Sequence, residues 1–102
     1  YFGAEMKYNR IDTILGPGMN IHRHPLNGRN YEYISEDTIL TGKICAAELK
    51  GLHRAGVEGT IKHFCANNQE MRRHFADPVV SERALREIYL KGFEMIVLMQ
   101  WV

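Results

Sequence analysis

The chain has 102 residues, of which 45% are hydrophobic and 25% are charged, and its formal net charge is +1. These values are ordinary for one small globular domain with a modest core. They exclude the concentrated positive charge of a nucleic-acid-binding or anionic-membrane surface, and no apolar run approaches the length of a membrane span.

The chain ends and the cysteines give weaker indications. The sequence starts at Tyr1 and stops at Trp101-Val102 inside an apolar segment, so we expect a chain cut at both ends. Cys45 and Cys65 are too few for a disulfide framework, and two buried free thiols are the simpler interpretation. This interpretation slightly favours a reducing compartment such as the cytoplasm over a secreted location.

The first third of the sequence predicts a helix tail, a short strand and a long polar loop. The helix ends near Asn9, and residues 11–15 form a short buried strand that Gly16-Pro17-Gly18 stops. The loop of residues 16–37 holds two histidines, two arginines, three asparagines and two tyrosines. Such a density of planar hydrogen-bonding groups is unusual in a loop that contacts only solvent, so we interpret the loop as part of a binding site for a polar ligand.

A helix and a second strand follow this loop. The helix covers about residues 42–55, and Gly56 closes it. Residues 57–64 have β character, and a second polar loop covers residues 65–78. The apolar positions that keep roughly helical spacing in the predicted helix are Ile44, Ala47, Leu52 and Ala55.

A last helix is predicted after the second loop, with Ser81 as its N-cap. Gly92 lies inside this helix, where it is either a small loss of helix propensity or a point of close packing. The apolar residues with the spacing of a helix packed on a sheet are Leu85, Ile88, Tyr89, Phe93, Ile96 and Val97.

Strands that alternate with helices predict an α/β fold with a parallel sheet. The right-handed crossover rule then places both polar loops at the carboxyl edge of that sheet, where ligand sites of such folds lie. Two strands alone leave bare edges on both sides. We therefore expect the chain to pair with other copies or, as the favoured alternative, to be part of something larger.

Basic residues lie within both predicted loops and at the end of the second predicted strand. Arg29 offers a planar fork of donors suited to neighbouring hydroxyls or a carboxylate. Lys62 and His63 end the second strand, which must stop or twist there for both to reach one site. One of Arg72 and Arg73 could reach the same site, and the other could pair with Glu70 or Asp77. For each residue the alternative is an ordinary exposed side chain.

His22 and His24 resemble the paired imidazole ligands of some zinc hydrolases. Pro25 follows at once, and no third histidine or clear carboxylate lies nearby in sequence. We therefore favour a hydrogen-bonding role in the loop over metal binding.

Carboxylates near the loops are candidates for acid and base chemistry. Cleavage of a glycosidic bond needs two carboxyl groups that face one bond, but the spacing here selects no pair. The candidates are Glu32, Glu36, Asp37 and Glu70. For Glu36 and Asp37 the simpler interpretation is that they favour the positive end of the following helix.

Four motifs carry a specific resemblance. In order they are Leu15-Gly-Pro-Gly-Met-Asn-Ile-His-Arg, Gly28-Arg-Asn-Tyr-Glu-Tyr-Ile-Ser-Glu-Asp, Ile61-Lys-His-Phe-Cys-Ala-Asn-Asn-Gln-Glu and Ser81-Glu-Arg-Ala-Leu-Arg-Glu-Ile-Tyr-Leu-Lys-Gly-Phe-Glu. Together they resemble glycoside hydrolase family 3, and in particular its β-glucosidases. The resemblance runs from about Gly3 to Val97.

The resemblance implies a fold and a set of binding residues. Residues 1–102 would be a fragment of the family's N-terminal (β/α)8 barrel domain, roughly two βα units of it. The residues that would hold sugar hydroxyls in the −1 subsite are Arg29, Lys62, His63 and Arg73, so the resemblance selects Arg73 over Arg72.

The resemblance also implies what lies elsewhere. The family's nucleophile is an aspartate in a Ser-Asp-Trp-like motif, which this sequence lacks, and its acid/base carboxylate comes from a later domain. We therefore expect a segment of a retaining β-glucosidase that binds a β-glucoside or oligosaccharide without cofactor, metal, nucleic acid or membrane. The alternatives are a non-catalytic truncated or self-associating fragment and, ranked far below, a metal hydrolase built on His22 and His24.

Overall fold

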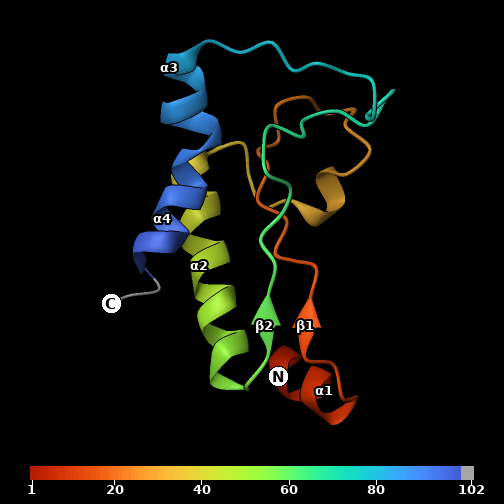
Figure 1. Ribbon diagram of the computed structural model, residues 1–102, viewed down its shortest axis with the longest axis vertical. Helices are drawn as coiled ribbons and strands as arrows, with labels where there is room; N and C mark the ends of the chain where they lie inside the picture. Colours follow the sequence, from red (N-terminus) through yellow and green to blue (C-terminus); the bar gives the residue numbers. More distant parts are fainter. Residues whose placement is uncertain (100–102) are drawn as a thin grey trace.

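The computed structural model describes residues 1–99, so the expectation for Trp101-Val102 lies outside the described residues. Figure 1 shows how the elements are arranged. In chain order they are α1 (Phe2–Tyr8), β1 (Thr13–Ile14), the 3₁₀ turn η1 (Asn30–Glu32), α2 (Thr38–Arg54), β2 (Glu58–Gly59), α3 (Glu82–Ala84), the π-helical turn η2 (Leu85–Tyr89) and α4 (Lys91–Met99).

The two strands pair in parallel, and the chain crosses between them through α2. Thr13 lies opposite Glu58, and Ile14 lies opposite Gly59. The predicted parallel pairing of an α/β unit is thereby confirmed. In Figure 1 both strands point toward the same end of the molecule, where the two polar loops meet, as predicted.

Both strands are shorter than the predicted residues 11–15 and 57–64. After Gly59 the regular pairing stops, and it returns as one isolated parallel bridge between Gly18 and Lys62. Pro17 has no N–H to donate, which interrupts the ladder between the two stretches. The N–H of Met19 still donates to the Lys62 carbonyl at 2.8 Å. The pairing therefore continues far enough to fix Lys62 beside the start of the first loop.

Helix α2 begins four residues earlier than predicted because Asp37 caps it. The Asp37 carboxylate accepts a hydrogen bond from the Leu40 N–H at 2.6 Å. This satisfies an N–H group that has no partner within the helix, and it places the negative charge at the positive end of the helix. Gly56, at a φ of 75°, follows the helix as predicted.

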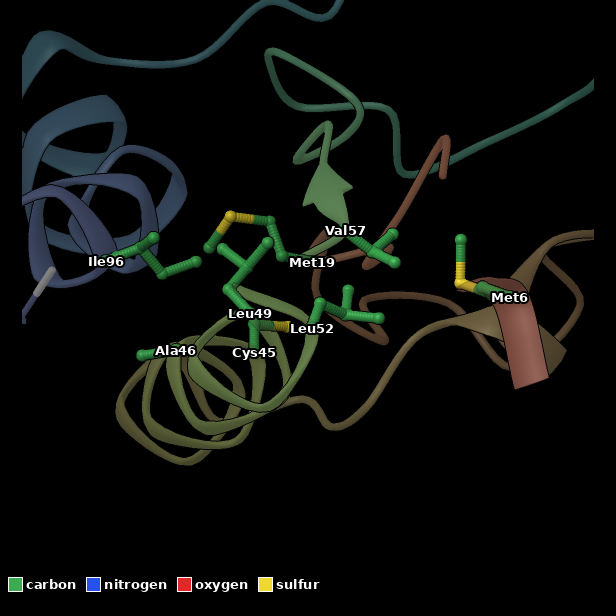
Figure 2. Close-up of a cluster of buried hydrophobic side chains, with 8 residues drawn as sticks. All are labelled: Met6, Met19, Cys45, Ala46, Leu49, Leu52, Val57 and Ile96. Atoms are coloured by element: carbon green, nitrogen blue, oxygen red, sulfur yellow. The ribbon is translucent and has the colours of Figure 1, made fainter. Parts of the chain in front are cut away.

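The buried face of α2 differs from the predicted one. Leu52 is buried as predicted, but Ile44 and Ala47 are exposed. Cys45 and Leu49 complete the buried face beside Leu52. Figure 2 shows these side chains directed at Met19 and Val57, with Ile96 of α4 and Met6 of α1 on either side. The helix packs on both the strands and α4, so its buried face is centred on positions 45, 49 and 52.

The predicted last helix is divided into α3, η2 and α4. Ser81 is its N-cap, as predicted, because its hydroxyl oxygen accepts from the Ala84 N–H at 3.2 Å. Ile88 and Val97 of the predicted stripe are exposed. Gly92 is a close-packing point, since a Cβ placed on Gly42 of α2 would lie 3.3 Å from the Gly92 Cα.

No helix among residues 1–99 is both long enough and apolar enough to cross a membrane.

Leu49 is fully buried at the centre of the core, whereas Leu26 is 85% exposed in the first loop. Replacing Leu49 with Ala should therefore lower the free energy of unfolding by about 2–5 kcal/mol. Leu26→Ala should change it by less than about 0.5 kcal/mol. Urea unfolding followed by circular dichroism at one fixed protein concentration measures both values, and equal shifts for the two variants would show that the core is placed wrongly.

Candidate functional site

The two polar loops meet at a cluster of planar polar side chains beyond the carboxyl ends of the strands. The Tyr33 hydroxyl, from the first loop, lies 3.1 Å from His63 Nδ1. It also accepts a hydrogen bond from Asn67 Nδ2 in the second loop at 2.9 Å. The predicted convergence of the loops is therefore present at the level of side chains.

Gly18 allows this approach. A Cβ at this position would lie 3.0 Å from both the Glu32 carbonyl oxygen and the Tyr33 ring. A side chain at this position would push the end of the first strand segment and η1 apart by a few tenths of an ångström, so glycine favours their close approach. Because Gly18 is also bridged to Lys62, the same close contact brings η1 beside Lys62.

Arg29 and Lys62 share one carboxylate in this cluster. Glu32 accepts a hydrogen bond from Arg29 Nε through Oε1 and pairs with Lys62 Nζ through Oε2, at 2.8 Å for the second pair. The side chains of Arg29, Glu32 and Lys62 are 20%, 17% and 24% exposed, respectively. The structure thus brings Arg29 and Lys62 close to each other, and the group that joins them is Glu32, for which the sequence suggested no partner.

Arg73 lies at the second loop's side of the cluster. Its Nε and the Nε of Arg29 are each 3.9 Å from Oε1 of Glu70, between the two arginines. Glu70 in turn accepts from Asn67 Nδ2 at 2.9 Å. Arg72 is exposed. Of the two neighbouring arginines, the structure brings Arg73 toward the other three predicted residues.

His63 is held on both its backbone and its ring by Asn20. The Asn20 amide donates to the His63 carbonyl at 3.0 Å and accepts from the His63 N–H at 2.8 Å, which fixes the orientation of the amide. The same Asn20 oxygen lies 3.2 Å from His63 Nδ1. These contacts favour a neutral ring with its proton on Nδ1, leaving Nε2 as an acceptor.

The charges of the cluster shift the pKa values of its members. Partial burial lowers the pKa of His63, and the nearby positive charges of Arg29, Arg73 and Lys62 lower it further. Burial alone would raise the pKa of Glu32, but the hydrogen bonds from Arg29 and Lys62 outweigh it, so the net pKa of Glu32 is lowered. At neutral pH the cluster thus combines an uncharged imidazole with ionised carboxylate, guanidinium and ammonium groups.

A cavity of about 1120 Å³ lies between the two loops. His63, Glu70 and Arg73 line it, together with the exposed apolar side chains of Leu26 and Phe64. Arg29 and Lys62 do not line it. Of the four predicted binding residues, two therefore border this cavity. Arg29 lies near its lining residue Glu70, and Lys62 is linked to Arg29 through Glu32.

His22 and His24 both make hydrogen bonds within the first loop. His22 Nε2 donates to the Asn30 carbonyl at 2.9 Å, and His24 Nδ1 accepts from the Leu26 N–H at 3.1 Å. Within residues 1–99 no group of three histidine, cysteine or acidic side chains is arranged to hold a metal ion. Both histidines are thus engaged in hydrogen bonds inside the first loop.

The two cysteines are free in the structure. Cys45 is fully buried, and burial raises the pKa of its thiol to about 12. Cys65 is only half-buried, so the predicted burial is complete for Cys45 alone.

Sequence reasoning missed three members of the cluster and did not choose among two others. Asn20, Tyr33 and Asn67 were not singled out, because nothing in their local pattern separates them from other loop residues. Glu32 was a candidate carboxylate without a partner, and Glu70 was a candidate whose only expected partner was one of Arg72 and Arg73. For Glu32 a signal existed, since it follows Arg29 by three residues, a spacing at which side chains on one helical turn meet.

The model of the glycosyl hydrolase family 3 N terminal domain matches residues 1–101 of the chain. A β-glucosidase from Ruminococcus albus is 74% identical over 97 residues, which are 95% of this chain and 10% of that protein. The chain thus spans about a tenth of the length of this relative.

Solved structures agree with the sequence matches. A β-glucosidase from Paenibacillus barengoltzii superimposes with a TM-score of 0.91 at 62% identity, covering 94% of this chain and 10% of that one. The β-glucosidase 3B of Thermotoga neapolitana, solved in complex with α-D-glucose, gives a TM-score of 0.90 at 55% identity, with 93% and 13% covered. The small α/β fragment described above therefore has the fold of the corresponding part of these enzymes.

The lowered pKa of His63 has a measurable consequence. Its ring should titrate below the ordinary value of 6.5 in an NMR titration of the folded chain. Arg73→Gln should move the pKa of His63 upward, because it removes one of the neighbouring positive charges. Arg83→Gln, on the exposed surface of α3, should leave it unchanged.

The same shift links His63 to stability. Because the folded pKa lies below the unfolded one, the unfolded chain binds more protons as pH falls below about 6.5. The His63 contribution to the free energy of unfolding is therefore present above that pH and is lost as pH falls through the folded pKa. A His63 pKa at or above the ordinary value would contradict the described surroundings of the ring.

Proposed function

The chain belongs to glycosyl hydrolase family 3, and from this membership we propose that it is a segment of a retaining β-glucosidase that supplies part of the sugar-binding subsite. In this proposal the chain forms roughly two βα units of a (β/α)8 barrel. The substrate is a terminal, non-reducing β-D-glucosyl residue. The observation that carries the proposal is the convergence of Arg29, Lys62, His63 and Arg73 on one cluster at the carboxyl ends of the strands.

The barrel part of the proposal is supported by the open edges of the sheet. The parallel pair of β1 and β2 has no further strand beside it within residues 1–99. Ile11 and Leu15 flank β1 and are exposed. Neighbouring strands on both sides would cover such residues and satisfy the edges, as closure of a barrel does.

The chemistry of the cluster suits a sugar ring. Guanidinium and ammonium groups donate to hydroxyl oxygens, and a neutral imidazole with a free Nε2 accepts from a hydroxyl hydrogen. Arg29, Lys62 and Arg73 are then the donors to the glucosyl hydroxyls, and His63 is the acceptor. Contacts of this kind accelerate the reaction to the extent that they tighten in the transition state.

The covalent steps need two reacting carboxyl groups, and no carboxyl group of this chain is assigned to either role. In a retaining glycosidase one carboxylate attacks the anomeric carbon and another protonates the leaving group. Glu32 is bonded to two cations, and Glu70 lies between two arginines. We therefore propose that both reacting carboxyl groups come from outside this chain, and that the reaction uses no cofactor.

The Ruminococcus albus relative offers a direct test of the proposed residues. A chimera carries this chain in place of the 97 aligned residues of that β-glucosidase. In the chimera, Lys62→Ala or His63→Ala should lower kcat/KM for an aryl β-glucoside by about 10- to 100-fold, the value of a hydrogen bond to a charged or polar group in a site.

Lys50→Ala is the matched control, because Lys50 is exposed on α2 far from the cluster. It should leave kcat/KM within about twofold of the unmodified chimera, as surface changes usually do. Unchanged activity of both Lys62→Ala and His63→Ala, in a chimera that is itself active, would refute the proposed binding role.

The purified chain alone should not hydrolyse an aryl β-glucoside above the uncatalysed rate. The reason is that neither Glu32 nor Glu70 is free to act as nucleophile. Release of the aryl group is measured in the absence of any other glycosidase. Turnover that survives repeated purification and follows the concentration of the chain would show that the reacting carboxyl groups are within it.

A further inference from the structure

The cluster of charged side chains depends on the carboxylate of Glu32. In the proposed subsite this carboxylate makes no contact with the sugar. Glu32 is the only group among residues 1–99 that pairs within 3.0 Å with both Arg29 and Lys62. Glu70, the other nearby carboxylate, is 3.9 Å from Arg29 Nε. Glu70 is therefore too far away to take over the role of Glu32 without rearrangement.

The way in which Glu32 binds each cation leaves donors free. It occupies Nε of Arg29, and within the described part of the chain the guanidinium shows no other bond shorter than 3.5 Å, so its two terminal nitrogens stay available. The Lys62 ammonium has three N–H groups, of which Glu32 takes one. The carboxylate thus holds both cations by one side and leaves the other donors for a ligand.

Without this carboxylate the two cations would repel each other. Both are largely removed from solvent, where like charges interact more strongly than in water. An exposed surface pair would contribute little, but Glu32 is only 17% exposed and joins two segments that lie 30 residues apart in sequence. Removal of the Glu32 carboxylate should therefore move the side chains of Arg29 and Lys62 while the fold is kept.

We propose that Glu32 is a positioning residue of the sugar subsite, whose single carboxylate fixes Arg29 and Lys62 at the spacing that the glucosyl hydroxyls require. This inference rests on the proposed function, since it needs Arg29 and Lys62 to contact sugar. Glu32 itself does not contact the sugar. It acts through the two cations, as a group that orients metal ligands acts through those ligands.

The chimera with the Ruminococcus albus β-glucosidase allows the test. Glu32→Gln keeps the shape of the side chain but removes its charge, and it should lower kcat/KM for an aryl β-glucoside by about 10- to 100-fold. Glu32→Asp keeps the charge and should recover part of this loss. Glu87→Gln, an exposed pair partner on η2, is the matched control and should change kcat/KM by less than about twofold.

A double-mutant cycle separates positioning from a general effect on folding. If Glu32 acts through Lys62, the loss from Glu32→Gln should be at least about threefold smaller in the Lys62→Ala background, because contacting residues are not additive. An equal loss in both backgrounds, accompanied by a lower melting temperature, would assign Glu32 a purely structural role and overturn the inference.

The outcomes also separate this inference from the proposed function. Full activity of Glu32→Gln beside a strongly impaired Lys62→Ala variant would overturn the positioning role alone. Full activity of Lys62→Ala would overturn the proposed function and the positioning role together.

Discussion

The parallel pairing of two short segments determines where both polar loops lie. Thr13 and Ile14 pair with Glu58 and Gly59, and the bridge between Gly18 and Lys62 extends the contact past Pro17. Because the pairing is parallel, the loops that follow the two segments lie at the same edge, beyond the carboxyl ends of the strands. The proposed site requires both loops at this edge. Arg29 and Tyr33 come from the first loop, and His63, Asn67 and Arg73 come from the region that follows the second segment.

Charge balance is what then keeps the cluster together. Three cations stand close to one another, which is unfavourable unless carboxylates lie between them. Glu32 separates Arg29 from Lys62, and Glu70 separates Arg29 from Arg73. His63 remains uncharged at neutral pH because its partial burial and the surrounding positive charge both lower its pKa. The result is a surface rich in hydrogen-bond donors with one neutral acceptor, the imidazole of His63.

The sequence predicted the order of elements, their parallel pairing and the meeting of the two loops, because these follow from local patterns and from the crossover rule. It did not predict that Pro17 divides the pairing, that α2 buries Leu49, or that Ile44 and Ala47 are exposed. The buried face of α2 depends on which other elements the helix packs against, and these come from distant parts of the chain. Arg29, Lys62, His63 and one of Arg72 and Arg73 could be chosen because polar side chains at the end of a strand, and in the loops at the same edge, can face one site. The choice of Arg73 came from the family resemblance. Tyr33 and Asn20 could not be chosen, because their partners come from distant parts of the chain. The subsite role of the four residues stays a prediction.

The most direct measurement is a crystal structure of the active chimera with the Ruminococcus albus β-glucosidase, soaked with glucose. We expect glucose hydroxyls within about 3.2 Å of Lys62 Nζ and His63 Nε2, which is hydrogen-bond distance, with Glu32 bridging Arg29 and Lys62 behind them. Glucose bound in the chimera with none of Arg29, Lys62, His63 and Arg73 in contact with it would refute the proposed subsite.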